Sequence, residues 1–231
     1  DRAMVVGFDY DVHLLSALTS DRKVLERAIK DARVGERGGT ELRDAVSQVI
    51  EREFKRVEGR KAIILLTDGK DFGSEIAERD LLDEAAESGA MIYSVYFETE
   101  GRRSGWNAPP WPLPRRRRSG WGRRDPFPAQ RPAPNDRRRQ RVEMRNQEAI
   151  AFLTELSEVS AGRFYSSKVA DLKKTFKLVA EELRHQYRLG FYPDTSKADG
   201  GRHNLRVEVN VPDVVVRARK SYQAALAVTG S

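Results

Sequence analysis

Two short motifs carry oxygen-bearing side chains that could bind a metal ion. Thr40 follows the glycines at positions 38 and 39, and Asp68 follows the apolar run of residues 62–66. An uninterrupted apolar run of this length is typical of a strand covered on both faces, as in a parallel sheet between helices. Ligands of such sheets bind beyond the carboxyl ends of the strands, where helix N-termini also lie. We therefore expect the Thr40 hydroxyl and the Asp68 carboxylate to meet at one edge of the sheet.

Each motif also has a purely structural explanation, which the sequence leaves open. Asp68-Gly69 suits a turn after a strand, and Thr40 suits the N-cap of a helix that extends as far as Gly59. Neither explanation excludes a ligand role, because a capping hydroxyl can also face an ion. Mg²⁺ favours octahedral oxygen coordination and keeps several waters, so two protein oxygens alone make a poor site. Further ligands must come from elsewhere.

Residue combinations typical of enzymes do not occur in the sequence. The three histidines, His13, His185 and His203, fall in separate predicted elements. There is no Gly-x-Ser-x-Gly elbow, no phosphate-binding loop, and no Gly-x-Gly-x-x-Gly after a strand. A hydrolase that uses Asp68 is the least favoured hypothesis, because neither a base nor a nucleophile accompanies it. We predict a binding protein, without catalytic residues and without a small-molecule substrate.

The net charge of +7 comes from one segment of the 231 residues. Residues 100–145 contain fourteen arginines against four acidic residues, so this segment carries +10 and the rest of the chain −3. Inferring nucleic-acid binding by the folded body from its overall charge would therefore be misplaced. The sequence contains no cysteine, which excludes disulfides and thiolate metal sites. It also contains no apolar run near the ~20 residues that a membrane-spanning helix needs.

Residues 98–143 are predicted to form a disordered, solvent-exposed insertion, because arginine and proline replace the aliphatic residues of a core. Alternating arginines and tryptophans also suit an alternative function, binding of a polyanion or nucleic acid through residues 102–145. The side chains for such contacts are Arg115, Arg116, Arg117, Arg118, Trp111 and Trp121. A solubilising loop is the simpler interpretation.

The order of apolar patterns predicts an α/β fold with a doubly wound, mostly parallel sheet and helices on both faces. Residues 3–8 and 12–18 favour an antiparallel strand pair, and residues 90–97 favour another buried strand. We expect this domain to occupy residues 1–184, apart from the insertion. Alternating apolar residues then predict a small antiparallel β extension over 185–222, followed by a tail over 223–231.

The motifs around Thr40 and Asp68 together resemble the von Willebrand factor type A domain. The matching stretches are Gly38-Gly39-Thr40-Glu41-Leu42-Arg43-Asp44-Ala45 and Ile63-Ile64-Leu65-Leu66-Thr67-Asp68-Gly69. In that family, Gly-Gly-Thr and Thr-Asp-Gly supply a threonine and an aspartate of a metal-ion-dependent adhesion site. Residues 183–193 and 216–220 resemble a bacterial branch of related proteins.

The resemblance implies a protein-binding module in which Thr40 and Asp68 hold Mg²⁺ or Mn²⁺. A protein partner would fill an open coordination position with a carboxylate. Gly39 and Asp71 are candidates for contacts just outside these ligands. The resemblance also implies an extracytoplasmic location in a bacterium.

The sequence departs from the family in one respect, since it contains no Asp-x-Ser-x-Ser motif. The resemblance implies that this motif lies upstream, with a first strand and helix, and that this chain is an N-terminally truncated fragment. The missing strand would be central to the sheet. We therefore expect the chain alone to bind metal poorly and to be marginally stable.

Overall fold

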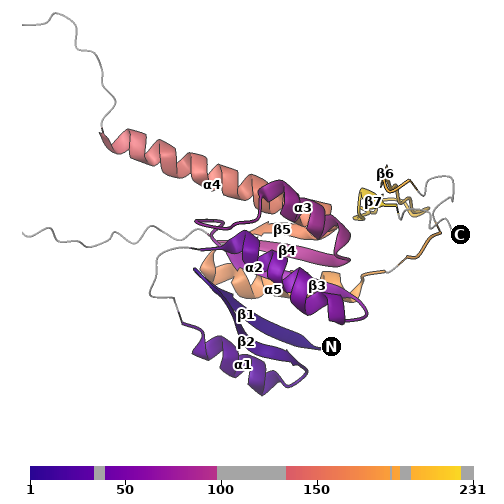
Figure 1. The fold of residues 1–231 in the computed structure, drawn as a ribbon, viewed down its shortest axis with the longest axis horizontal. Coiled ribbons are helices and arrows are strands. Elements are labelled where there is room, and N and C mark those ends of the chain that lie inside the picture. Colours follow the sequence, from indigo (N-terminus) through magenta and orange to yellow (C-terminus); the bar gives the residue numbers. More distant parts are fainter. Residues whose placement is uncertain (34–39, 98–133, 188, 193–198, 225–231) are drawn as a thin grey trace, which may run out of the picture.

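The computed structural model describes residues 1–33, 40–97, 134–187, 189–192 and 199–224, without the side chains of 134–139. At its centre lies a three-stranded parallel sheet in the order β3 (Lys61–Thr67), β4 (Ala90–Tyr96) and β5 (Arg163–Ser166). Lys61 pairs with Ala90 and Thr67 with Tyr96, so β3 and β4 are in register over their whole lengths. The strand predicted around residues 61–67 is confirmed, as is the α/β fold (Figure 1).

Three helices cover one face of this sheet: α2 (Leu42–Gln48), α3 (Glu78–Glu87) and α4 (Pro134–Val159). Alternate residues of β3 and β4 point toward them, as strand geometry requires. The shared core contains Leu42, Val46, Ile50, Leu65, Leu81, Ala85, Ile92, Tyr96, Phe152, Leu153 and Leu156. After α2 the chain continues as a π-helical turn, η1 (Val49–Glu53), and a 3₁₀ turn, η2 (Phe54–Arg56).

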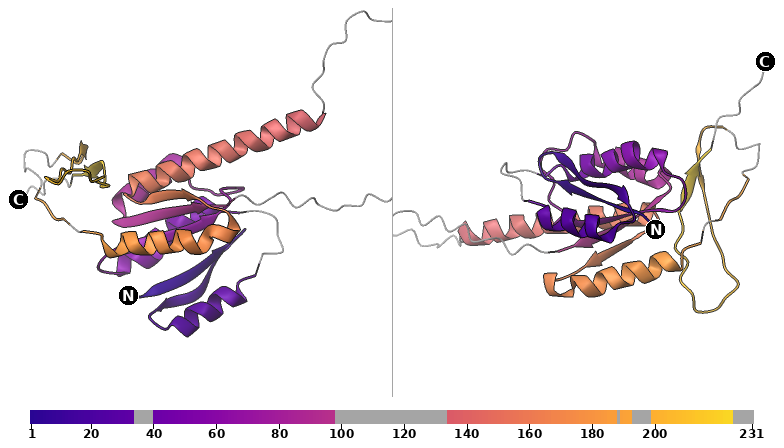
Figure 2. Two further views of the ribbon diagram at one scale, coloured as in Figure 1. Left: turned by 180° about the vertical axis from the view of Figure 1, so that it is seen from behind. Right: turned by 90° about the horizontal axis from the view of Figure 1, so that it is seen from below.

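Helix α5 (Leu172–Arg184), preceded by the 3₁₀ turn η3 (Val169–Asp171), lies on the other face. Its Glu182 carboxylate accepts hydrogen bonds from the hydroxyls of Tyr93 in β4 (3.5 Å) and Tyr165 in β5 (3.4 Å). Figure 2 shows the sheet between α5 and the α2–α3 layer, as the doubly wound prediction requires.

The prediction that β3 is covered on both faces is wrong. Ile64 and Leu66, which alternate with the buried Leu65, are 41% and 39% exposed. In the described part of the chain β3 forms one edge of its sheet, and α5 packs on β4 and β5 instead.

Strands β1 (Ala3–Phe8) and β2 (Val12–Thr19) form a separate antiparallel pair, as predicted, and α1 (Arg22–Asp31) packs on it. Asp21 caps α1 by accepting a hydrogen bond from Lys23 N (2.8 Å). Phe8 packs against the main core, so the strand pair is attached to the body at the end of β1 (Figure 1).

The C-terminal extension is antiparallel, as predicted, but much shorter. Only β6 (Arg202–Asn204) and β7 (Ser221–Gln223) pair, followed by a bond from Leu205 N to the Lys220 carbonyl (2.8 Å). Residues 186–192, which the predicted extension includes, contain no strand in their described part. Beyond the base of the hairpin most of the valines are exposed, for example Val215 at 83%. Without a surface to bury them, their alternation does not produce a ladder.

Helix α4 begins at Pro134, inside the predicted insertion, so residues 134–143 of that insertion are helical. Arginine and glutamine are good helix formers, and a helix can continue past the core when its residues favour it. The N-terminal part of α4 extends beyond the body (Figures 1 and 2). Residues 98–133, the rest of the predicted insertion, and 225–231, most of the predicted tail, lie outside the described part of the chain.

A first prediction concerns the close approach of the chain after α4 to β4. A Cβ at Gly162 would collide with the Ile92 carbonyl oxygen, which is held in the sheet. We expect Gly162→Ala to lower the free energy of unfolding by about 3 kcal/mol, measured by urea denaturation, because backbone must shift to relieve the clash. Gly190→Ala is the matched control, since nothing lies within 4 Å of a Cβ there. Equal effects of the two substitutions would contradict the prediction.

Candidate functional site

The candidate site lies where β3 ends. Asp68 directly follows β3, and its carboxylate accepts a hydrogen bond from Lys70 N (3.3 Å) and pairs with Lys70 Nζ (2.5 Å). Gly69 turns the chain with a φ of 73°, which favours glycine, and its N–H donates to Thr67 Oγ1 (3.0 Å). A Cβ at Gly69 would lie only 2.6 Å from Ala149 Cβ. Helix α4 therefore packs directly against the turn that positions Asp68.

Thr40 reaches the same edge through a backbone bridge. The Phe72 N–H donates to the Thr40 carbonyl oxygen (2.8 Å), and the Glu41 N–H donates to the Asp9 carbonyl oxygen at the end of β1 (2.7 Å). Because Phe72 is four residues after Asp68, the bridge brings Thr40 beside the loop that Asp68 begins. The N-cap residue of α2 is Glu41, so the interpretation of Thr40 as the cap of that helix is wrong. We call these two segments, residues 40–41 and 68–75, the rim.

Asp71 ties the loop of residues 68–75 to the start of α2, directly after residues 40–41. Its Oδ2 accepts hydrogen bonds from Arg43 N (3.0 Å), Arg43 Nε (3.2 Å) and Ser74 Oγ (2.8 Å), and its Oδ1 accepts one from Ser74 N (3.2 Å). The Arg43–Asp71 pair is partly buried, at 25% and 17% side-chain exposure. The carboxylate predicted to lie near a bound ion thus stabilises the loop itself.

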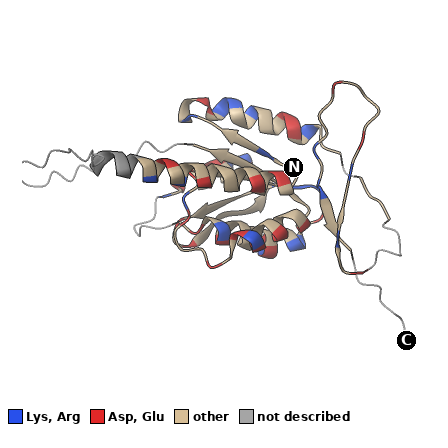
Figure 3. Cartoon of the chain, turned by 90° about the horizontal axis from the view of Figure 1, so that it is seen from above, with Lys and Arg blue, Asp and Glu red and all other residues tan. Residues whose placement is uncertain are grey.

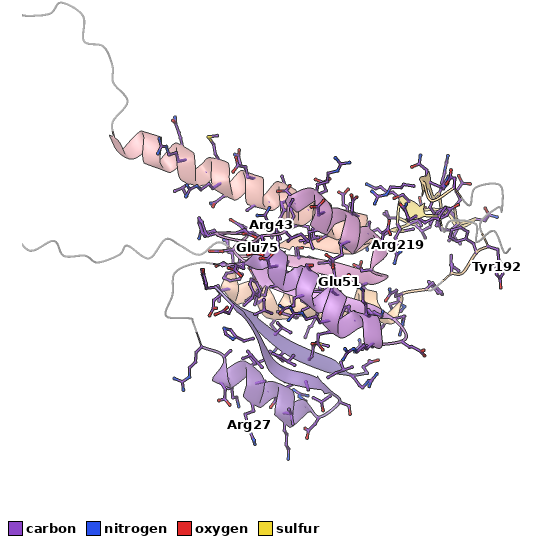
Figure 4. The ribbon with its side chains drawn as sticks, viewed as in Figure 1. Arg27, Arg43, Glu51, Glu75, Tyr192 and Arg219 are labelled. Atoms are coloured by element: carbon purple, nitrogen blue, oxygen red, sulfur yellow. The ribbon has the colours of Figure 1, made fainter. Side chains whose placement is uncertain are left out.

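Asp44 has a matching role that the sequence analysis missed. Its two carboxylate oxygens accept hydrogen bonds from Glu75 N (2.8 Å) and Ile76 N (2.9 Å). Arg43 and Glu75 lie at the same end of the body in Figure 4. An aspartate in the first turn of α2, facing a loop without regular secondary structure, is the signal that could have indicated this role, because free loop N–H groups need acceptors.

Negative charge gathers at the rim. The pKa of Glu41 is raised, first by burial and then by repulsion from neighbouring carboxylates. These neighbours are Asp44, Asp11, Glu75 and Asp71. Along the described helices, in contrast, acidic and basic residues are interspersed (Figure 3). The rim therefore attracts cations and repels anions.

The described residues fit a divalent ion only in part. Thr40 and Asp68 offer hard oxygen donors, which Mg²⁺ prefers. Across the described ranges, however, no three His, Cys, Asp or Glu side chains come together as a possible metal-binding group. Thr40 and Asp68 alone do not complete the coordination sphere of Mg²⁺, so other groups would have to supply the remaining ligands.

Several predicted site residues lie outside the described part of the chain. Gly39 belongs to the undescribed range 34–39. The residues predicted to contact a polyanion, Trp111, Trp121 and the arginines 115–118, belong to the undescribed range 98–133. The structure therefore tests neither group.

Comparisons with known proteins agree with this architecture. Residues 1–70, from the start of the chain through the turn after β3, match the model of the von Willebrand factor type A domain. The chain thus has a fold like that of the von Willebrand factor type A domain. The conserved hypothetical protein BatB from Bacteroides thetaiotaomicron has a similar fold, with 17% identity, a TM-score of 0.50 and 80% of each chain covered. No match is found among curated proteins.

A second solved structure with a similar fold is an aerotolerance-related membrane protein from Bacteroides fragilis NCTC 9343. It has 15% identity and a TM-score of 0.50, again over 80% of each chain. At this identity the likeness shows the fold alone. Among the described helices, none combines the length and apolar composition that a membrane span requires.

A second prediction tests whether Asp71 holds the loop of residues 68–75 against the start of α2. We expect Asp71→Ala to lower the free energy of unfolding by roughly 1–3 kcal/mol, because it leaves partly buried donors of Arg43 and Ser74 unsatisfied. Asp80→Ala, at an exposed position in the first turn of α3, should change it by less than about 0.5 kcal/mol. Urea denaturation measures both. An Asp71→Ala variant as stable as the control would contradict this role.

Proposed function

We propose that this chain belongs to a metal-ion-dependent protein-binding module, whose rim receives a carboxylate of a protein partner through Mg²⁺ or Mn²⁺. The observation that supports this most directly is the bridge between Thr40 and Phe72. It brings a hydroxyl-bearing residue beside the loop that begins with Asp68. Von Willebrand factor A domains are commonly protein-interaction modules, which supports the coarser part of the proposal.

The charge of the rim explains why a cation is part of the proposal. The carboxylates that raise the pKa of Glu41 would repel a carboxylate of a partner. An acidic partner can therefore approach only if positive charge lies between the two surfaces. Lys70 pairs with Asp68 and supplies one such charge, but the rim still has an excess of acidic groups.

In this proposal Thr40 contributes its hydroxyl and Asp68 its carboxylate, each directly or through water. When bound, a divalent ion supplies a coordination position that a partner's carboxylate can fill. Asp71 and Asp44 hold the surrounding loops through their hydrogen bonds. Gly39 would let the backbone approach the ion. The function is binding and not catalysis.

We also propose that the protein acts outside the cytoplasm of a bacterium. Two of the similar structures come from Bacteroides species, and one of them is described as a membrane protein. A protein-binding surface of this kind would then face partners in the cell envelope or outside it.

A third prediction concerns metal affinity. We expect the 231-residue chain to bind Mg²⁺ weakly, with a Kd on the order of 1 mM or higher, because no three His, Cys, Asp or Glu side chains of its described residues come together as a metal-binding group. Isothermal titration calorimetry measures this, and Asp68→Asn should weaken the binding further. Micromolar binding that Asp68→Asn leaves intact would place the ion elsewhere.

A fourth prediction tests partner binding. Immobilised chain is exposed to envelope proteins of the source organism in Mg²⁺, and bound proteins are then eluted with EDTA. We expect EDTA to release the partner, and Thr40→Ala and Asp68→Asn each to reduce its capture at least tenfold, while the exposed control Asp31→Asn retains it. Capture that survives EDTA but falls steeply with salt would instead indicate a polyanion-type contact. Capture unaffected by either substitution at the rim would overturn the proposal.

A further inference from the structure

A groove lies at the other end of β3 from the rim. It is bounded by the turns η1 and η2, by α3 and by the base of the β6–β7 hairpin, and has a volume of about 600 Å³. Lys61, the first residue of β3, lines it. Because a strand rises about 3.3 Å per residue, the seven residues of β3 separate the groove from Asp68 by roughly 20 Å. The groove is therefore distinct from the candidate adhesion site.

Most charges that line the groove are already paired. Glu51 pairs with Lys55 within the helical turn. Arg202 of β6 pairs with Asp83 (2.7 Å) and with Glu87 (3.5 Å) on α3. Figure 4 shows Glu51 on the turn that follows α2, away from Arg43 at the rim. One carboxyl group that lines the groove takes part in none of these ion pairs.

That group is Glu84 of α3. Its Oε1 is buried and has no hydrogen-bond partner among the residues that the structure describes. Burial raises the pKa of Glu84, and repulsion by Glu51 raises it further, while a hydrogen bond with Ser47 and the charge of Lys55 oppose this. A buried acceptor without a donor is unfavourable, so a turn of the Glu84 side chain toward an N–H group of a ligand in the groove is favoured.

A second feature marks the same place. The helix that starts with α2 changes to π-helical geometry over Val49–Glu53, and Ile50 and Glu51 of this turn line the groove. A π turn is less favourable than continued α-helix, and such turns occur frequently at functional sites. Phe54, which follows directly, adds an aromatic side chain to the lining.

We propose that this groove is a second binding site, for a ligand that carries an alkylammonium or guanidinium group. The Glu84 carboxylate turns toward the groove and accepts a hydrogen bond from the cation, and Ile50 and Phe54 contact the apolar stem that carries it. A lysine or arginine side chain of a peptide and a free polyamine share this chemistry. Lys61 lines the groove without an ion pair in the described part of the chain, and it disfavours a ligand that is cationic along its whole length. A peptide side chain is therefore the favoured source.

The test uses the full 231-residue chain and three probes: acetyl-Gly-Lys-Gly-amide, acetyl-Gly-Arg-Gly-amide and spermidine. Two-dimensional NMR titration gives affinities and shows which backbone amides shift. We expect at least one peptide to bind more tightly than spermidine, and to shift the amides of Phe54, Glu84 and Arg202. Tighter binding of spermidine with the same shifts would support the cation site and assign it to a polyamine.

Glu84→Gln keeps the shape of the side chain and removes its charge, and should weaken peptide binding at least tenfold. Glu78→Gln, exposed in the first turn of the same helix, is the matched control and should bind like the unmodified chain. NMR spectra of each variant report whether it is folded. Absence of binding of all three probes to the unmodified chain, or equal affinities of Glu84→Gln and Glu78→Gln, would overturn the proposal.

Discussion

The close packing of α4 on β4 is the contact on which the rest of the structure depends. Ser157 Oγ bonds to Ser94 Oγ (2.9 Å), and Ser160 Oγ accepts a hydrogen bond from Ile92 N (3.0 Å), with both serines fully buried. Small side chains at these positions let the helix approach the strand closely. The same helix presses Ala149 against Gly69, next to Asp68. One helix thus holds both the core of the sheet and the turn at the candidate site.

At the rim, irregular backbone is stabilised by carboxylates. Asp71 and Asp44 together accept hydrogen bonds from backbone N–H groups at the start of α2 and in the loop of residues 74–76. These bonds satisfy loop donors that no ladder or helix could pair. They also concentrate negative charge around Glu41. The groups that stabilise the loops therefore also determine which ligands the rim can accept, since cations are attracted and unassisted anions are repelled.

The two ends of β3 present different chemistry. The rim offers oxygen donors on open loops, whereas the groove combines paired charges, an aromatic side chain and one buried carboxyl oxygen. The base of the C-terminal hairpin contributes Arg202 to the groove, so an element outside the parallel sheet completes this second site. Sites at opposite ends of the same strand could bind two partners at once.

The sequence by itself determined the elements whose residues repeat with a clear period or end in strong signals. The apolar run of β3, the strand pair β1–β2 and the buried strand β4 were predicted at nearly their observed bounds, because apolar periodicity and turn residues are local properties. The paired motifs around Thr40 and Asp68 also indicated the von Willebrand factor A fold.

Tertiary structure decided what depends on neighbours far away in the chain. It left Ile64 and Leu66 exposed on β3, gave the role of helix cap to Glu41 instead of Thr40, and used Asp71 and Asp44 to hold loops. It also left the alternating valines of the C-terminal hairpin unpaired beyond its base, because burial and hydrogen-bond partners come from other elements, which no local pattern specifies.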